Sequence, residues 1–147
     1  RPALRKIKNQ KLAIRFFTKN EWERNQIIEK KTEVGYLNVS SPELTAFDLV
    51  QYHKRIGGLN RILPILEELT EIIKPSFLLK TAKTQKKPNV QRLGFLLDKL
   101  GSEKLSSSLI GLMSPSSKEL PLSLAHKKRT GRKNEKWKII ENTILDF

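Results

Sequence analysis

The 147-residue chain has no cysteine and two histidines. The lack of cysteine excludes a disulfide framework, a cysteine-ligated zinc site and a thiol nucleophile. No apolar run approaches the roughly 18 residues that a membrane-spanning helix needs, so we expect no membrane contact. His53 and His126 have no spacing typical of metal ligands, and no phosphate-binding glycine motif occurs. We therefore predict no metal and no cofactor.

Positive charge is what the sequence has in excess. Lysine and arginine total 29 against 15 acidic residues, which gives a net charge of +14 and a pI near 10.1. Such a bias favours a polyanionic partner, with nucleic acid ahead of an anionic membrane surface. The segment 41–73 has a net charge of −2 and is rich in leucine and isoleucine, whereas basic segments flank it on both sides. We expect the middle of the chain to form the core.

Alternating apolar residues predict strands near the N-terminus. Residues 11–18 have this pattern, and further strands are predicted at 26–31 and 34–39, together forming an antiparallel set.

Helical spacing begins at Ser41, which can cap a helix that starts at Pro42. Because proline is tolerated only near a helix start, Pro64 places the regular part of the second helix from about Leu63. The predicted helices cover residues 42–56, 60–73, 75–82, 89–100 with Asn89 as the cap, and a weaker stretch from Ser102.

Strand patterns return near the C-terminus. Residues 120–124 have an edge-strand pattern, and a last strand is predicted from Trp137 to about Ile144. The order of strands, helices and strands predicts one α+β domain over residues 1–147. In it, a small mixed or antiparallel sheet from both chain ends packs against a layer of about four to five helices.

Four ordered motifs suggest a family. They are Val39-Ser40-Ser41-Pro42-Glu43-Leu44-Thr45-Ala46-Phe47-Asp48-Leu49-Val50, then Gly57-Gly58-Leu59-Asn60-Arg61 with Leu66-Glu67-Glu68-Leu69, then Gln91-Arg92-Leu93-Gly94-Phe95-Leu96-Leu97, and finally Trp137-Lys138-Ile139-Ile140-Glu141-Asn142. Over residues 34–147 this order resembles the C-terminal domain of AbiEi-type antitoxins, the predicted regulators of viral defence.

The resemblance implies a function. Proteins of that family repress their own operon and neutralise a nucleotidyltransferase toxin without a stable complex, in what is called a type IV system. It therefore implies a bacterial, cytoplasmic antitoxin and regulator domain in phage defence. We do not expect the family's N-terminal winged helix-turn-helix within this sequence, because residues 1–33 are strand-like and too few.

The densest charge cluster is a predicted basic turn. Its five cations lie within seven residues around Gly131, and they are Lys127, Lys128, Arg129, Arg132 and Lys133. Cations so close together can contact successive phosphates and release counterions, which makes binding salt-dependent. The alternative is a solvated hairpin whose charges only increase solubility. We expect DNA rather than RNA as the partner.

Other basic residues extend this candidate surface. Lys86 and Lys87, together with Lys83, lie in a loop that can add to it or be an ordinary solvated loop. Arg92 can bind a phosphate bidentately, although pairing with Asp48 or Glu43 between helices is favoured for a charge on a buried helix. Arg61 is predicted at a helix start, where a cation suits the helix dipole poorly, so a specific contact is plausible.

Four further residues have structural interpretations. Gly94 within a helix indicates close packing against a neighbour. Trp137 and Tyr36 can stack on bases, but core packing is favoured at alternating strand positions. His53 is expected at the surface or half-buried on its helix.

Two other function classes remain as alternatives. A protein-interaction domain would dock a partner through an exposed apolar patch on the second and fourth helices. A metal-dependent nuclease would use Glu29-Lys30-Lys31, but no second acid is obviously placed to share the metal ion. We therefore predict a protein that is not an enzyme.

Overall fold

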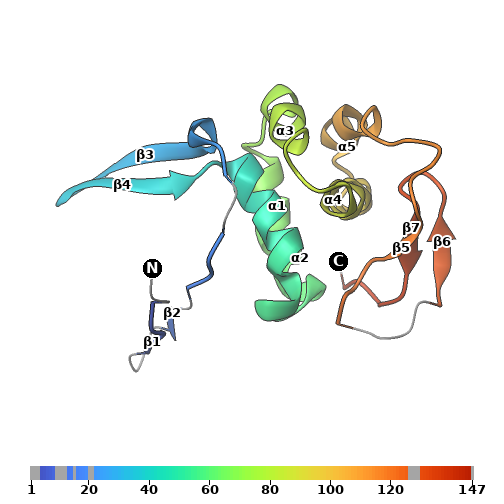
Figure 1. Ribbon diagram of the computed structural model, residues 1–147, viewed down its shortest axis with the longest axis horizontal. Coiled ribbons are helices and arrows are strands. Elements are labelled where there is room, and N and C mark those ends of the chain that lie inside the picture. The colour runs from blue at the N-terminus through green and yellow to red at the C-terminus, as the bar shows by residue number, and fades with distance from the viewer. Residues whose placement is uncertain (1–3, 9–12, 15, 20–21, 126–129, 147) are drawn as a thin grey trace.

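The computed structural model describes residues 4–8, 13–14, 16–19, 22–125 and 130–146. Five helices form its centre, and small sheets lie on either side of them (Figure 1). This arrangement confirms the predicted α+β class. The strands of the two chain ends form separate sheets rather than one shared sheet.

The N-terminal strands form two hairpins. Strands β1 (Ile7–Lys8) and β2 (Ala13–Ile14) form a minimal pair. Strands β3 (Ile27–Thr32) and β4 (Gly35–Ser40) form a longer antiparallel ribbon, which projects from the helices in Figure 1. The predictions for 26–31 and 34–39 are thus correct to within one residue. Within the segment 11–18, where one strand is predicted, the described residues form only the short strand β2. Part of that segment lies outside the described residues.

Helix α1 (Pro42–Tyr52) begins as the sequence predicts. The Ser41 Oγ accepts a hydrogen bond from the Leu44 N–H at 3.2 Å, and Pro42 occupies the first turn, where its missing N–H has no intrahelical partner. A short 3-10 turn, η2 (His53–Arg55), continues the helix. Gly57 and Gly58 then follow with positive φ angles, a conformation that glycine adopts without strain.

The remaining helices differ from prediction mainly at their starts. Helices α2 (Leu59–Thr70), α3 (Pro75–Ala82), α4 (Lys87–Lys99) and α5 (Glu103–Ile110) follow in order. Helix α2 is regular from Leu59, so the prediction that Pro64 delays it to Leu63 is wrong. Asn89 is not a cap, because α4 begins two residues earlier and Asn89 donates to Gln51 Oε1 at 3.0 Å.

The C-terminal sheet joins three short strands. Strand β7 (Ile139–Glu141) lies between β5 (Leu120–Pro121), to which it is parallel, and β6 (Arg132–Asn134), to which it is antiparallel. Trp137 precedes β7 rather than opening it.

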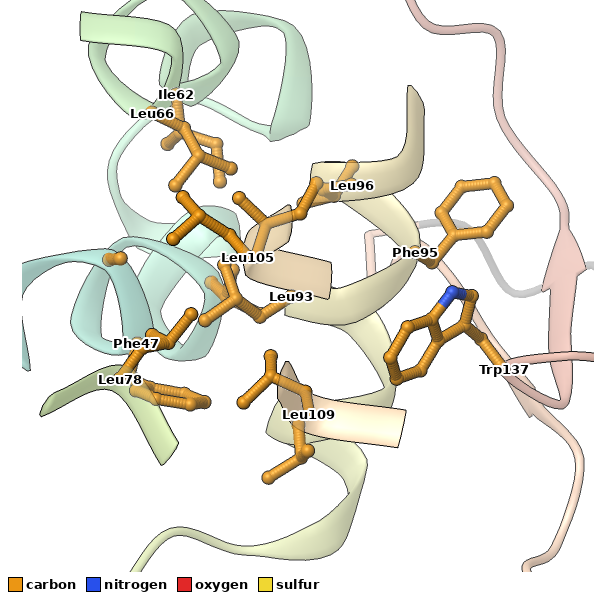
Figure 2. Packing of buried hydrophobic residues seen from close by; sticks show 14 of the residues in the cluster. Phe47, Ile62, Leu66, Leu78, Leu93, Phe95, Leu96, Leu105, Leu109 and Trp137 are labelled. Atoms are coloured by element: carbon orange, nitrogen blue, oxygen red, sulfur yellow. The ribbon is translucent and has the colours of Figure 1, made fainter. Parts of the chain in front are cut away.

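Helix α4 is the centre of the core. Every residue from Asn89 to Leu97 is buried, and apolar residues of the other helices and of β7 surround this stretch (Figure 2). Trp137 is fully buried, which confirms its predicted packing role. A Cβ added at Gly94 would lie 2.2 Å from the Trp137 ring, so Gly94 is required for this close contact, as predicted.

Candidate nucleic-acid interface

The predicted basic turn is described only in part. Lys127, Lys128 and Arg129 lie outside the described residues, so their predicted role is untested. Arg132 and Lys133 are exposed on β6. The Lys133 Nζ lies 2.9 Å from Glu119 Oε2, and this hydrogen bond and charge raise the pKa of Lys133. One of the predicted phosphate ligands therefore already has a carboxylate partner.

Other cations near the C-terminal sheet are paired in the same way. Lys136 lies 2.7 Å from Asp98, Lys138 lies 2.7 Å from Glu135, and Lys99 lies 3.2 Å from Glu141. Burial alone would raise the pKa of Asp98, but hydrogen bonds from Lys136, Ser106 and Trp137 lower it. These four lysines, with Lys133 among them, therefore already have carboxylate partners within the protein.

Arg92 is a buried structural residue, with 5% of its surface exposed. Its guanidinium donates hydrogen bonds to the Pro121 carbonyl at 3.0 and 3.2 Å and to the Leu122 carbonyl at 3.1 Å. Burial lowers its pKa to about 10, so it stays charged at neutral pH. A structural role was favoured, but the predicted partners are wrong.

Asp48 and Glu43 have partners other than Arg92. The Asp48 carboxylate forms an ion pair with Lys19, and Glu43 Oε1 accepts a hydrogen bond from the Lys74 N–H at 3.3 Å. Solvent reaches only a small part of the Arg92 side chain, so a phosphate could contact Arg92 only there.

Two more side chains hold the segment that Arg92 contacts. His53 Nε2 accepts the Leu124 N–H at 3.2 Å, so Nδ1 carries the proton and donates to the Val50 carbonyl at 2.7 Å. The Asn142 amide exchanges two hydrogen bonds with the backbone of Ser123, at 2.8 and 3.0 Å. We refer to His53, Arg92 and Asn142 as the clasp.

His53 is fully buried, so its predicted exposure is wrong. Burial lowers the pKa of His53; the hydrogen bond to Val50 opposes this shift, and the charge of Arg92 adds to it. The histidine is therefore held neutral, as its acceptor role toward Leu124 requires.

A second group of cations lies around the ends of α1 and the starts of α2 and α4. All of its members are exposed, and within the described part of the chain none pairs with a carboxylate; they are Lys54, Arg61, Lys83, Lys86 and Lys87. This group includes three of the predicted site residues. The Arg61 side chain lies across Gly57, where an added Cβ would meet its Cδ at 2.6 Å.

Two cavities open beside these cations. The larger, about 620 Å³, is lined by Lys54, Arg55 and Arg61 with apolar Phe17, Ile56 and Ile65. The smaller, about 210 Å³, is lined by Lys19, Lys86 and Thr84 with Gln51, Tyr52 and Gln85. Lys83 and Lys87 line a third hollow near Val90.

An aromatic contact joins the two larger cavities. The Phe17 and Tyr52 rings stack with centroids 5.5 Å apart and an angle of 16° between their planes. The Arg55 guanidinium lies 5.8 Å from the Phe17 centroid. Since Phe17 lines one cavity and Tyr52 the other, the stack and both cavities form one surface, which we call the basic groove.

The sequence patterns did not single out Phe17, Tyr52, Lys54 or Arg55. The spacing of Tyr52 and Arg55, three residues apart on a helical stretch, places them on one face and is a signal that could have been used. No local pattern links Phe17 to that face.

The alternative sites have little support. Tyr36 is 69% exposed on the ribbon rather than in the core. Glu29 lies opposite Asn38 on the same ribbon, and within the described ranges no cluster of three acidic or histidine residues could bind a metal ion. Helix α2 exposes Ile65, and Ile72 is exposed in the turn that follows, but buried α4 adds nothing to the apolar patch predicted for a protein-interaction domain.

No helix in the described ranges is both long and apolar enough to cross a bilayer. The fold and its surface thus define an α+β domain that combines a helical core with a large excess of positive charge.

The family model of the AbiEi antitoxin C-terminal domain matches residues 20–99, more than half of the chain, and the chain belongs to this family. Membership supports an antitoxin or regulator role in a toxin–antitoxin system, a role that is regulatory rather than catalytic. The match ends with α4, so the motif at 137–142 lies beyond it. No curated protein and no solved structure matches the chain.

Proposed function

We propose that this chain is the antitoxin and regulator domain of a type IV abortive-infection system, acting in the bacterial cytoplasm in phage defence. Its counterpart is a nucleotidyltransferase toxin, which it counteracts without a stable complex. The family membership supports the antitoxin role, and the resemblance described above supports the type of system.

The domain acts by binding nucleic acid through the cations of the basic groove and the neighbouring loop. The observation that carries this proposal is the set of exposed lysines and arginines without carboxylate partners in the described part of the chain. Such side chains can replace condensed counterions at phosphates without first breaking an ion pair. DNA is the expected form, because a regulator acts at its operator.

The predicted basic turn remains a second proposed contact; its cations are Lys127, Lys128, Arg129, Arg132 and Lys133. The pairing of Lys133 with Glu119 makes this turn the weaker of the two. Changing all five residues to serine tests it directly, since a true contact would lower both the affinity and its salt dependence.

A duplex-binding assay at several salt concentrations tests the main proposal. The variant R61S/K86S/K87S should bind more weakly, with the slope of log K against log salt reduced by about 2 to 3, at about 0.9 per lost phosphate contact. The matched control K99S/K136S/K138S removes the same number of charges from lysines that pair with carboxylates, and it should keep most of the slope. Equal losses in both variants would mean that only total charge matters.

Growth rescue tests the antitoxin role itself. The chain is expressed with a neighbouring nucleotidyltransferase toxin, and restored growth by the folded domain is the expected result. Failure of a folded, soluble domain to restore growth would contradict the antitoxin proposal.

A further inference from the structure

Phosphate binding leaves one part of the basic groove unexplained. Phosphates need cations, but the groove also holds the stacked rings of Phe17 and Tyr52, with Arg55 over one of them. Phe17 is 38% exposed although it is large and apolar. Exposed aromatic rings among cations are typical of surfaces that bind the bases as well as the backbone of nucleic acids.

The stack is held in position from two directions. Tyr52 and Arg55 lie on α1 and η2, with Asp48 one helical turn before Tyr52. The segment that carries Phe17 is fixed to the same helix by the ion pair between Lys19 and Asp48. A ring that is anchored in this way loses little conformational freedom when a ligand binds.

Cations lie on both sides of the stack. Lys54 and Arg61 line the larger cavity beside Phe17, and Lys86 lines the smaller cavity beside Tyr52. A ligand that reaches both cavities therefore passes the rings and meets positive charge before and after them. A nucleic-acid strand has this alternation of flat bases and charged phosphates.

We propose that the basic groove binds single-stranded nucleic acid, with one unpaired base extending the Arg55–Phe17–Tyr52 stack and the flanking phosphates at Lys54 and Arg61 on one side and Lys86 on the other. This inference rests on the proposed function, because it uses the same cations. A duplex keeps its bases stacked on one another, whereas a single strand can turn a base toward protein rings.

The size of the larger cavity is consistent with this ligand. A volume of about 620 Å³ falls within the roughly 300–1,000 Å³ of small-ligand sites. A cavity in this range can hold a single nucleotide.

Fluorescence anisotropy with labelled oligonucleotides tests the proposal. The probes are oligothymidine and oligouridine of about 12 nucleotides, within the usual range of single-strand sites, and a duplex of the same length. The variants F17L and Y52L remove one ring each, and Y52F keeps the ring without its hydroxyl. The matched control is F77L, because Phe77 is also exposed and has Lys74 at 5.8 Å from its ring.

F17L and Y52L should each weaken single-strand binding by about 5- to 150-fold, the range for loss of one base–aromatic stack. Y52F and F77L should bind as the unchanged protein does, and duplex binding should change little in all four. Comparison of the DNA and RNA strands identifies the preferred sugar. Thermal unfolding checks that each variant is folded. The residue that F17L changes lies outside the helices.

Four outcomes would overturn the inference. Single-strand binding that is insensitive to F17L in a folded variant removes the role of the stack. An equal loss in F77L shows a general surface effect. Duplex binding without single-strand binding rejects the inference but keeps the proposed function, whereas failure to bind any probe rejects both.

Discussion

Two basic regions of this molecule use their charge in different ways. Around the C-terminal sheet, Lys133, Lys136 and Lys138 each lie within 3 Å of a carboxylate. Around the ends of α1 and the start of α4, Lys54, Arg61 and Lys86 have no such partner in the described part of the chain. The density of lysine and arginine along a sequence therefore does not locate the charge that a polyanion can use.

The largest expected effect separates a buried arginine from an exposed one. R92M should lower the free energy of unfolding by about 3–5 kcal/mol, because three hydrogen bonds from a charged donor are lost and two backbone carbonyls lose their partner. R61M should change stability by less than about 0.5 kcal/mol, as surface substitutions do, but should weaken duplex binding.

Denaturant unfolding and salt-dependent binding, measured on both variants, check this contrast. A folded R92M that loses binding as strongly as R61M would break the distinction between structural and binding cations.

The substitution G94A, at the contact between α4 and Trp137, should have the next largest effect on stability. G94A places a methyl group against the buried Trp137 ring, and over-packing of this kind costs about 1–3 kcal/mol. G111A is a suitable control, since a Cβ there meets nothing within 4 Å. Thermal unfolding of the two variants gives the comparison, and an unaltered melting temperature for G94A would contradict the observed packing.

A smaller effect should appear with pH. Because the pKa of His53 is lowered in the folded state, the unfolded chain binds more protons below about pH 6.5. The stability contributed by neutral His53 is complete above that pH and is lost as the pH falls, with a slope of at most about 1.4 kcal/mol per pH unit.

Unfolding of the unchanged protein and of H53Q between about pH 7.5 and 5.5 isolates this slope, since the other titrating groups are common to both. Equal slopes would show that His53 does not titrate differently on unfolding.

The smallest effect is expected for the exposed ion pairs. K133S should hardly change stability, because ion pairs at the surface gain little in water. Its effect on duplex binding should be smaller than that of K86S. If K133S weakened binding more than K86S, the nucleic acid would bind near the C-terminal sheet rather than at the basic groove.

Local chemistry made much of the fold predictable. Ser41 and Pro42 set the start of α1, the paired glycines follow the 3-10 turn that continues it, and alternation placed β3 and β4 to within a residue. Gly94 indicated a close contact and Trp137 a core position, and both are correct.

The failures concern contacts between distant parts of the chain. The burial of His53 depends on residues 121–124, about 70 positions later, and the partners of Arg92 come from the same segment. Phe17 meets Tyr52 in the same non-local way. Periodicity describes the environment along one element and carries no information about which remote segment covers it.

The clasp has a consequence for how relatives of this chain can diverge. Its three side chains recognise main-chain carbonyls and N–H groups of residues 121–124, which every amino acid except proline supplies in full. Exposed Leu124 should therefore vary freely among homologues, whereas a change at His53, Arg92 or Asn142 should require a compensating change elsewhere. An exposed side chain of that segment can thus change while the path of the segment across the helices stays the same.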